Sequence, residues 1–475
     1  MSEKRVTSWR NPRPIVERVE VTGELKLQTP AHFGGGDPDP FSNVGMVLLR
    51  DPLEGKALLP GASIAGALRN YLREVSVGYE NKEGQVVTNL LGGSKGDDEG
   101  KQSPLIVDDA LAEVKAIELR DGVRIDPATG TAAEGAKFDM ELLSAGTSFP
   151  LHFELLIDEG RAETLLKSLA LALRGFETGE ITLGARKRRG FGRCQVDKWK
   201  VTRYKLTEPE GLIDWLDGRS VSQQSGSSIA TVLGVTLDSE TDARHRFTID
   251  AMFSIDGSLM VRSGFGESDT GPDMVHLHAI QPDGSKKPIL PGTSLAGVIR
   301  HRALRIANTL RPSEGAKLIN QMFGGDEKGA LTASRVVVRE SVIKDTVSWV
   351  QNRVKIDRFT SGAYETALFE EQPVFDNGRS QLNVHLMLRN PEKHEIGLLL
   401  LVLKDLWTGD LPVGGESSVG RGRLKGTSAT LTLQRDGQQT TWRIKQDGTR
   451  LEVDQPDVLK AYVDALNNQP WEATK

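Results

Sequence analysis

Two segments of the chain alternate hydrophobic and polar residues with a period of two. The first reads VERVEVTGELKL over residues 16–27, and the second reads RFTIDAMFSIDGSLMV over residues 246–261. Such alternation predicts a strand that buries one face against a core. A glycine-rich loop follows each strand, FGGGDPDP from Phe33 and SGFGESDTGPD from Ser263. The chain therefore begins the same structural pattern twice.

After each glycine-rich loop, a short apolar run (MVLL or MVHL) predicts another strand, and a Pro-Gly pair then opens a helical pattern. The two helical sequences are LPGASIAGALRNYLRE (59–74) and LPGTSLAGVIRHRALR (290–305). In the first, Ile64, Leu68 and Leu72 lie at i, i+4 and i+8. This spacing predicts an amphipathic helix whose apolar stripe faces the core.

A leucine-rich helix is predicted near the end of each pattern, at residues 163–179 and 394–409, and a strand follows each helix. The order strand, helix, strands, helix, strand is that of a ferredoxin-like βαββαβ domain. We therefore predict an α+β protein with two tandem ferredoxin-like domains.

The two patterns match residue by residue at a nearly constant spacing. The Pro-Gly helices share six identities, each pair 231 positions apart (291 minus 60). The identities are Pro60, Gly61, Ser63, Ala65, Gly66 and Arg69, matched by Pro291, Gly292, Ser294, Ala296, Gly297 and Arg300. VRIDP from Val123 matches VKIDR from Val354 at the same spacing, and GFGR from Gly190 matches GRGR from Gly420. The chain is therefore a tandem duplication.

A duplication accounts for the length of the chain, since 475 residues exceed what one ordinary core accommodates. We place the first domain at residues 1–225 and the second at 240–475. A linker is expected at about 204–245, because this segment contains the polar runs QQSGSS and DSETDARH.

Composition excludes several classes of protein. Charged residues make up 26% of the chain and hydrophobic residues 38%, as in a soluble globular protein. The longest apolar run, residues 396–403, is too short to cross a bilayer, and the N-terminus has no apolar signal segment, so we expect a cytoplasmic protein without membrane contacts. Cys194 is the single cysteine, which excludes an internal disulfide. The net charge of −5 means that nucleic-acid binding would need a local basic patch.

One basic patch lies in the glycine-rich loop GARKRRGFGR (184–193). Its cations are Arg186, Lys187, Arg188, Arg189 and Arg193. Glycines let the backbone approach a phosphodiester while these side chains neutralise it, although a solvated charged face is the alternative. The second copy, GGESSVGRGR (414–423), keeps Arg421 and Arg423. A dinucleotide fingerprint is disfavoured because the loop follows a helix and enters a strand, and the chain contains no P-loop motif.

The start of each Pro-Gly helix is a second candidate for phosphate binding. Ser63 and Ser294 lie near free backbone N–H groups, where a hydroxyl either caps the helix or helps to bind phosphate. The glycine three residues later leaves that face without side chains. The predicted phosphate contacts of the two helices are Ser63, Gly66 and Arg69, with Ser294, Gly297 and Arg300.

One difference between the repeats lies just before the second strand. Aligning VGMVLL with PDMVHL pairs Gly45 with Asp273. An aspartate at such a junction is often only a turn residue, but the glycine in the other copy shows that the fold does not require a carboxylate there. His276 and His278 lie on the strand that follows, and no third metal ligand is evident near them.

Together these motifs resemble the RAMP superfamily of CRISPR-associated proteins, in particular the backbone subunits of type III effector complexes. The resemblance rests on the early glycine-rich loop, the LPG-x-S-[IL]-x-G-x-[IL]-R helix start, the R/K-I-D segment and the late G-x-G-R loop, in both repeats. A chain with two such units looks like the fused double backbone subunit of type III-D complexes. One departure is that the lysine often found between the helix serine and glycine is Ala65 or Ala296 here.

The resemblance implies a modified, RRM-like ferredoxin fold in each half, with an inserted β-hairpin thumb at residues 127–138 and 358–369. The implied partners are CRISPR RNA as guide, a single-stranded target RNA, and other backbone, large and small subunits. In nuclease-competent members an aspartate at the position of Asp273 is required to cut target RNA. In the first repeat only Asp37 or Asp39 could substitute.

RNA carries its own nucleophile, the 2′-hydroxyl, so cleavage mainly needs in-line geometry and charge stabilisation. Aspartate in water has a pKa of about 3.9, which makes it an inefficient base at neutral pH. Asp273 is therefore expected to hold Mg²⁺ or another divalent metal, as part of a metal-dependent endoribonuclease. The alternatives are a non-catalytic scaffold that binds CRISPR RNA, and an unrelated metabolic enzyme on the same fold.

Overall fold

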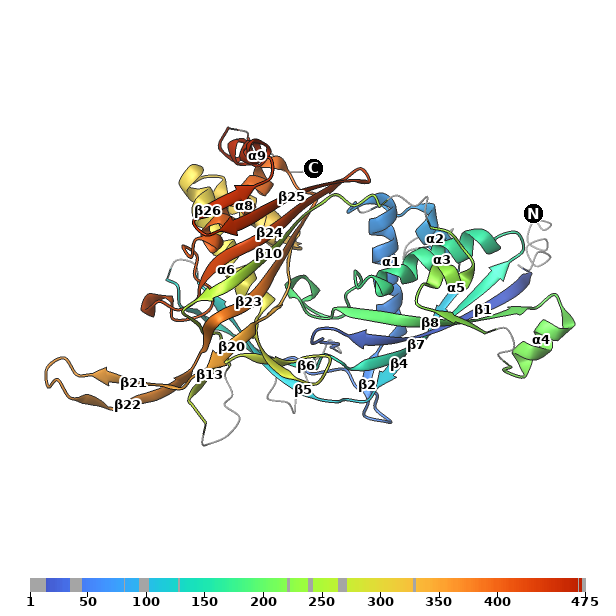
Figure 1. Ribbon diagram of the computed structural model, residues 1–475. Helices are drawn as coiled ribbons and strands as arrows, with labels where there is room; N and C mark the ends of the chain where they lie inside the picture. Colours follow the sequence, from blue (N-terminus) through green and yellow to red (C-terminus); the bar gives the residue numbers. More distant parts are fainter. Residues whose placement is uncertain are drawn as a thin grey trace, which may run out of the picture.

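The computed structural model describes residues 14–34, 45–80, 82–93, 102–126, 129–219, 223–237, 242–263, 271–327, 330–468 and 470–471. The two halves of the sequence form two sheets with helices packed on them, and the first repeat lies to the right of the second in Figure 1. No helix within this described part of the chain combines the length and the apolar character needed to span a membrane.

The first repeat contains an antiparallel sheet in the order β3-β7-β1-β8-β9. Its strands are β1 (Ile15–Leu27), β3 (Leu105–Val107), β7 (Ser148–Asp158), β8 (Cys194–Lys205) and β9 (Gln224–Gly226). The helices are α1 (Gly61–Val77), α2 (Gln85–Leu91), α3 (Ala162–Glu177), α4 (Pro209–Leu216) and α5 (Ile229–Leu233). The first strand lies between the third and the last of the βαββαβ pattern, as in a ferredoxin-like sheet.

The second repeat has the same arrangement, with β23 and β24 on either side of β10 and with β18 beside β23. Its main strands are β10 (Arg246–Asp256), β11 (Ser258–Leu259), β18 (Val336–Val338), β20 (Lys344–Ser348), β23 (Val374–Arg389), β24 (Arg423–Arg435), β25 (Gln438–Asp447) and β26 (Arg450–Val453). The helices are α6 (Gly292–Leu310), α7 (Gly315–Phe323), α8 (Lys393–Trp407) and α9 (Pro456–Asn468). The prediction of two ferredoxin-like domains is thus confirmed. The C-terminal strands β25 and β26 extend the second sheet.

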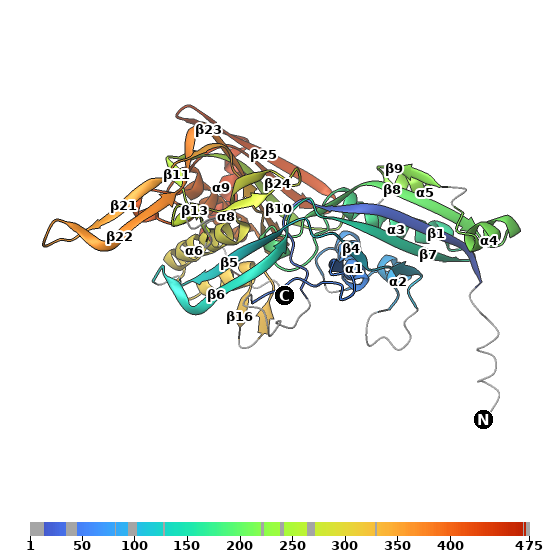
Figure 2. The same cartoon turned by 90° about the horizontal axis from the view of Figure 1, so that it is seen from below.

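A β-hairpin projects from each sheet. The first consists of β5 (Ile117–Ile125) and β6 (Ala132–Leu143), and the second of β21 (Gln351–Ile356) and β22 (Ala363–Gln372). Both hairpins begin earlier than the thumb segments predicted from the sequence, because the residues before the tip also pair as strands. Figure 2 shows that the first hairpin runs along the second repeat, whereas the second extends away from both sheets.

Short strands connect these elements. They are β2 (Ala57–Leu59), β4 (Ala110–Ala112), β12 (Arg262–Ser263), β13 (Met274–His276), β14 (His278–Ile280), β15 (Lys286–Leu290), β16 (Gly325–Glu327), β17 (Ala330–Thr332) and β19 (Ser341–Val342). The MVHL run forms β13 as predicted. The MVLL run of the first repeat forms only isolated bridges, in which Met46 pairs with Met140 and Leu48 with Gly34.

Each repeat has its own hydrophobic core between sheet and helices. Alternate residues of β1, including Val19, Val21 and Leu25, are fully buried against α1 and α3, and those of β10 are buried in the same way in the second core. Ile229 and Leu233 of α5 belong to the first core. The segment expected as a linker therefore contains structure that packs on the first repeat, beyond residue 225.

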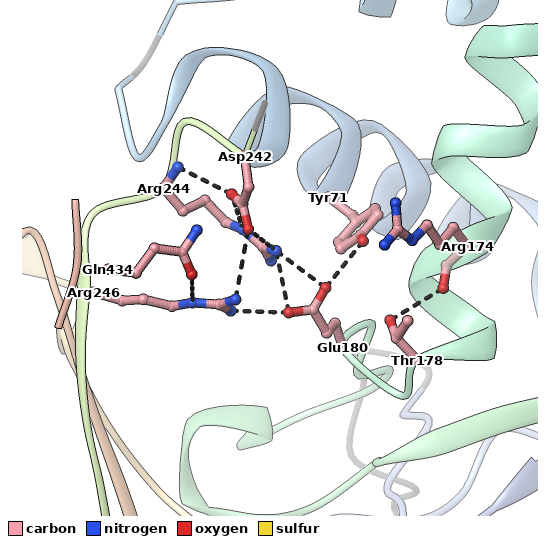
Figure 3. Close-up of polar contacts among 8 residues, drawn as sticks. All are labelled: Tyr71, Arg174, Thr178, Glu180, Asp242, Arg244, Arg246 and Gln434. Carbon is pink, nitrogen blue, oxygen red and sulfur yellow. Dashed lines mark hydrogen bonds and ion pairs between the residues drawn. The ribbon is translucent and has the colours of Figure 1, made fainter. Parts of the chain in front are cut away.

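The repeats are joined by a polar cluster, shown in Figure 3, in which Arg244 is buried and its charged partners are partly exposed. Glu180, three residues after the end of α3, accepts hydrogen bonds from Arg244 at 3.0 Å and from Arg246 at 2.9 Å. Asp242 also pairs with Arg244, at 2.6 Å. Burial alone would raise the pKa of Asp242, but the hydrogen bonds and charge of Arg244 outweigh burial and lower it to about 2.

A second polar contact between the repeats involves the first hairpin. Arg120 on β5 lies between Glu118 at 2.9 Å and Glu340 of the second repeat at 3.2 Å. All three side chains are less than a tenth exposed. The buried Arg120–Glu340 ion pair therefore holds the hairpin of one repeat against the other, and Glu118 of the same hairpin shares the cation.

Candidate nucleic-acid interface

A groove of about 620 Å³ opens beside the first Pro-Gly helix. Its walls come from the three segments that the sequence singled out, namely the early loop (His32 to Gly34), the α1 face and the late loop (Gly184 to Lys187). Gly184 is required for this meeting of loops, because its φ is +84° and a Cβ would lie 2.4 Å from the His32 carbonyl oxygen. Gly414 has the same relation to Met260 in the second repeat.

Ser63 and Gly66 line this groove. Both are exposed, and a Cβ added to Gly66 would meet no atom within 4 Å, as is also true of Gly297. The alternative that the serines cap their helices is wrong, because the caps are Pro60 and Pro291 and no side chain caps either helix start. The bare helix face is therefore open to a ligand.

Sequence reasoning missed one residue of this face. Asn70 lines the groove and lies seven positions after Ser63, so Ser63, Gly66 and Asn70 share the i, i+3, i+7 side of α1. The helical spacing from Ser63 could have revealed Asn70. The comparison of the repeats did not, because the counterpart of Asn70 is His301 and only identical residues were singled out.

Arg69 and Arg300 have a structural task that the sequence did not show. Arg69 donates to the Gly92 carbonyl at 3.0 Å and pairs with Glu83, while Arg300 donates to the Gly324 carbonyl at 2.9 Å. Each arginine thus satisfies a carbonyl at the end of the following helix, α2 or α7. This packing accounts for the doubled arginine, and a contact with RNA phosphate stays a prediction.

The basic loop of the first repeat carries uncompensated charge. Among the described residues, none of its five predicted cations forms a salt bridge. Lys187 lines the groove, and the Arg186 guanidinium lies 4.1 Å from the centre of the Phe138 ring. Burial and, to a smaller extent, the neighbouring charge of Arg300 together lower the pKa of Arg189 to about 10. Such a cluster favours an anionic ligand.

The same loop also contacts the second repeat. Arg188 donates to the Ser334 carbonyl, Arg189 donates to the Val336 carbonyl at 3.5 Å, and a Cβ on Gly292 at the start of α6 would lie 2.2 Å from the Arg189 carbonyl oxygen. Arg188 and Arg189, both predicted to contact phosphate, therefore each donate a hydrogen bond to the second repeat. Arg193 faces a different cavity, lined by residues of the second repeat.

The second late loop corrects one prediction. Arg421 is 3% exposed, and its guanidinium binds Glu371 at 2.8 Å and Glu416 at 3.0 Å. A side chain that is buried and neutralised in this way is not available to RNA, so we remove Arg421 from the predicted contacts. Arg423 is exposed, and its role stays a prediction.

Asp273 is exposed at the start of β13, beside the base of the second hairpin. One of its carboxylate oxygens, Oδ2, accepts the backbone N–H of Glu370 on β22 at 2.9 Å. In the first repeat Gly45 lies near the Asp139 carbonyl oxygen, and Asp139 is the counterpart of Glu370. Asp37 and Asp39 lie outside the described residues. The two repeats thus present the same backbone position with and without a carboxylate.

The described residues contain no group of three or more His, Cys, Asp or Glu side chains able to hold a metal ion. His276 is 1% exposed, with Nε2 3.0 Å from the Ile289 carbonyl oxygen, and burial lowers its pKa to about 4. It is therefore a packed core histidine. Binding of a metal ion by Asp273 stays a prediction.

Comparison with known proteins agrees with the repeat. The RAMP superfamily matches residues 24–195 and, separately, residues 254–425. Over 207 residues the chain is 27% identical to the protein named CRISPR system Cms endoribonuclease Csm3 from Streptococcus thermophilus. That alignment covers 39% of this chain and 90% of the streptococcal protein. One relative thus corresponds to about one repeat.

Proposed function

The chain belongs to the RAMP superfamily and carries two copies of its fold, and on this basis we propose that it is a backbone subunit of a type III CRISPR effector. In this role it binds CRISPR RNA and target RNA and cuts the target RNA, with Asp273 as the residue of the nuclease site. The expected partners are the other backbone, large and small subunits of the complex. Support for a nuclease comes from the similarity to a protein named an endoribonuclease.

The groove beside α1 supports binding of a guide strand. It combines a helix start, a bare glycine face and a glycine loop with cations that have no carboxylate partner, which together suit a phosphodiester backbone. None of these features reads a base, so the interaction is expected to be independent of guide sequence.

The observation that carries the nuclease proposal is the place of Asp273. Its carboxylate is tied to the hairpin by the Glu370 N–H, and that hairpin exposes apolar side chains, including Phe359 at 96% and Leu368 at 68%. Apolar residues on a projecting hairpin are suited to insert between nucleotides and to unstack them. An unstacked nucleotide can bring its 2′-hydroxyl in line with the bond to the leaving 5′-oxygen.

A single exposed carboxylate at this position is compatible with binding of a divalent cation. Mg²⁺ commonly takes only one or two protein carboxylates and completes its shell with water and substrate phosphates. Asp273 is exposed and has one oxygen engaged by the hairpin, so the other oxygen would hold the ion. The bound ion would supply charge stabilisation at the phosphate. The Asp273–Glu370 contact orients the carboxylate toward the hairpin, where the strand would be unstacked.

The test is cleavage of a complementary target RNA by the assembled complex, with Asp273→Asn as the main variant. Asparagine keeps an oxygen for the Glu370 N–H but removes the charge. We expect complex assembly and RNA affinity to remain, while the cleavage rate falls by roughly a hundredfold or more. Removal of divalent metal by a chelator should have the same selective effect.

Two controls separate this proposal from a non-catalytic scaffold. Asp447→Asn removes an exposed carboxylate on β25 and should leave cleavage unchanged. Gly45→Asp places a carboxylate at the equivalent position of the first repeat, where a Cβ has room, and should add a second cut. Full cleavage by Asp273→Asn would refute the assigned site.

A further inference from the structure

A second cavity, of about 370 Å³, lies between the repeats and shares no lining residue with the RNA groove. Arg193 from the late loop of the first repeat forms one wall. Arg339, Lys344, Asp250 and His385 of the second repeat form the others. The cavity faces the helix-free side of the second sheet, because Phe247, Ile249 and other alternate residues of the same strands point into the core.

Positive charge dominates this cavity. Arg193, Arg339 and Lys344 form no salt bridge within the described part of the chain, and Arg193 Nε is buried without a hydrogen-bond partner. Burial and, to a smaller extent, the nearby charge of Arg193 together lower the pKa of Arg339 to about 10. Glu340 also lines the cavity, but it is paired with Arg120. Asp250 is the remaining carboxylate of the wall.

Asp250 and His385 form a pair on adjacent strands, with Oδ1 of Asp250 2.6 Å from Nδ1 of His385. This contact fixes the imidazole ring and leaves its Nε2 atom for another partner. Burial lowers the pKa of His385, the bond to Asp250 opposes that shift, and the charges of Arg339 and Arg193 add to it. An anion in the cavity would relieve the repulsion among these groups.

The first repeat shows that this cluster is not required by the fold. There His152 occupies the strand position of His385, and its Nδ1 atom lies 2.7 Å from Oδ2 of Asp108. Asp108 is the counterpart of Arg339 at the spacing of 231 (339 minus 108). The second repeat thus has a guanidinium where the first has a carboxylate. The late loop of the first repeat places Arg193 in the same cavity as this guanidinium.

We propose that this cavity binds a phosphate group, supplied either by a segment of an RNA strand or by a free ribonucleotide. Two guanidinium groups, one from each repeat, provide fork-shaped donors to phosphate oxygens, and Lys344 adds a third charge. The volume exceeds that of one phosphate and leaves room for part of a nucleoside. This site is separate from the groove beside α1 and does not depend on Asp273, and only its RNA-strand form rests on the proposed function.

The experiment uses the full chain, freed of RNA, and measures binding of inorganic phosphate and of a ribonucleoside 5′-monophosphate by calorimetry. Arg339→Gln should weaken binding of both by about tenfold or more, since a charge-assisted hydrogen bond is lost. Arg450→Gln removes the same charge from an exposed position on β26 and should have no effect. Lys344→Gln, at an exposed position, is the second test should Arg339→Gln fail to fold.

Competition distinguishes the two sources of the phosphate. Displacement of bound monophosphate by short single-stranded RNA in the wild-type chain indicates a strand site, whereas retention of monophosphate beside bound RNA indicates a nucleotide site. The proposal is overturned if wild-type protein binds neither small anion, or if Arg339→Gln and Lys344→Gln bind them as tightly as wild type does. Loss of target cleavage has no bearing on this result, because the readout is binding of a small anion.

Discussion

The late loops of the two repeats have nearly the same backbone conformation, but they differ in charge and in what they contact. Arg186 and Glu416 both adopt left-handed conformations, with φ of 52° and 62°, and Gly190 and Gly420 follow with φ of 97° and 88°. The first loop is basic and packs against β18 and α6 of the second repeat. The second loop contains Ser417, Ser418 and Val419, all exposed. Glycines therefore set the shape of the loop, while the intervening side chains determine what it contacts.

The two hairpins also share a backbone arrangement but differ in the side chains packed at their bases. In the first repeat Met140, Leu142 and Phe191 form a small hydrophobic cluster. In the second repeat Glu371 and Arg421 replace Met140 and Phe191, and they form a buried ion pair. Duplication thus retained the hairpin but exchanged its internal support.

The largest expected effect comes from breaking the buried contact between the first hairpin and the second repeat. Arg120→Met leaves Glu118 and Glu340 buried without their cation, and should lower the free energy of unfolding by about 4 kcal/mol. The equivalent change in the second repeat, Gln351→Met, removes only the bond that Arg421 donates and should cost about 1 kcal/mol. Urea unfolding of both variants measures the difference. Equal losses would contradict a special role for the first hairpin at the junction.

The loop comparison can be tested at its paired glycines. Gly190→Ala should cost about 3 kcal/mol, because the left-handed backbone is strained and the new Cβ would lie 2.4 Å from the Glu340 nitrogen. Gly420→Ala has the same backbone strain but meets no atom within 4 Å, and should cost about 1 kcal/mol. Thermal melting of the two variants gives the ranking. A larger loss of stability for Gly420→Ala would contradict the finding that only the first late loop packs closely against another part of the protein at this glycine.

The polar cluster of Figure 3 predicts a loss of stability in acid. Because the pKa of Asp242 is lowered to about 2, its contribution is complete above about pH 4 and disappears as the pH falls toward 2. The contribution should be about 2 kcal/mol, and Asp242→Asn should lose it at every pH. Unfolding free energies measured from pH 6 to pH 2 should therefore converge between wild type and variant. Parallel curves would mean that Asp242 has an ordinary pKa.

The smallest effect concerns a single phosphate contact. Lys187→Gln should reduce the salt dependence of guide-RNA binding by about one counterion and weaken affinity at low salt by roughly 1 kcal/mol. Ser417→Lys introduces the missing charge at the equivalent, exposed position of the second repeat. That variant should increase the salt dependence by a similar amount if the second loop also follows the guide. Binding titrations at several salt concentrations measure both slopes.

Much of the fold was accessible from local patterns. The period of two in β1 and β10, the i, i+4, i+8 stripe of α1, and the matching sequence at the start of α6 predicted two ferredoxin-like units. The glycine positions were informative because backbone conformation is a local property. The hairpins were predicted too short, since strand pairing outside the tip depends on a partner that the local composition of 127–138 or 358–369 does not reveal.

The sequence by itself determined the duplication, the order of elements and the residues able to carry phosphate chemistry, because these depend on spacing and residue type. Only the tertiary structure decided which of these residues are free. Arg421 is neutralised by Glu371, and Arg69 is engaged by the end of α2. Arg193 meets Arg339 across the junction of the repeats. The physical reason is that the availability of a charge depends on burial and on partners distant in sequence, and these arise only when the chain has folded.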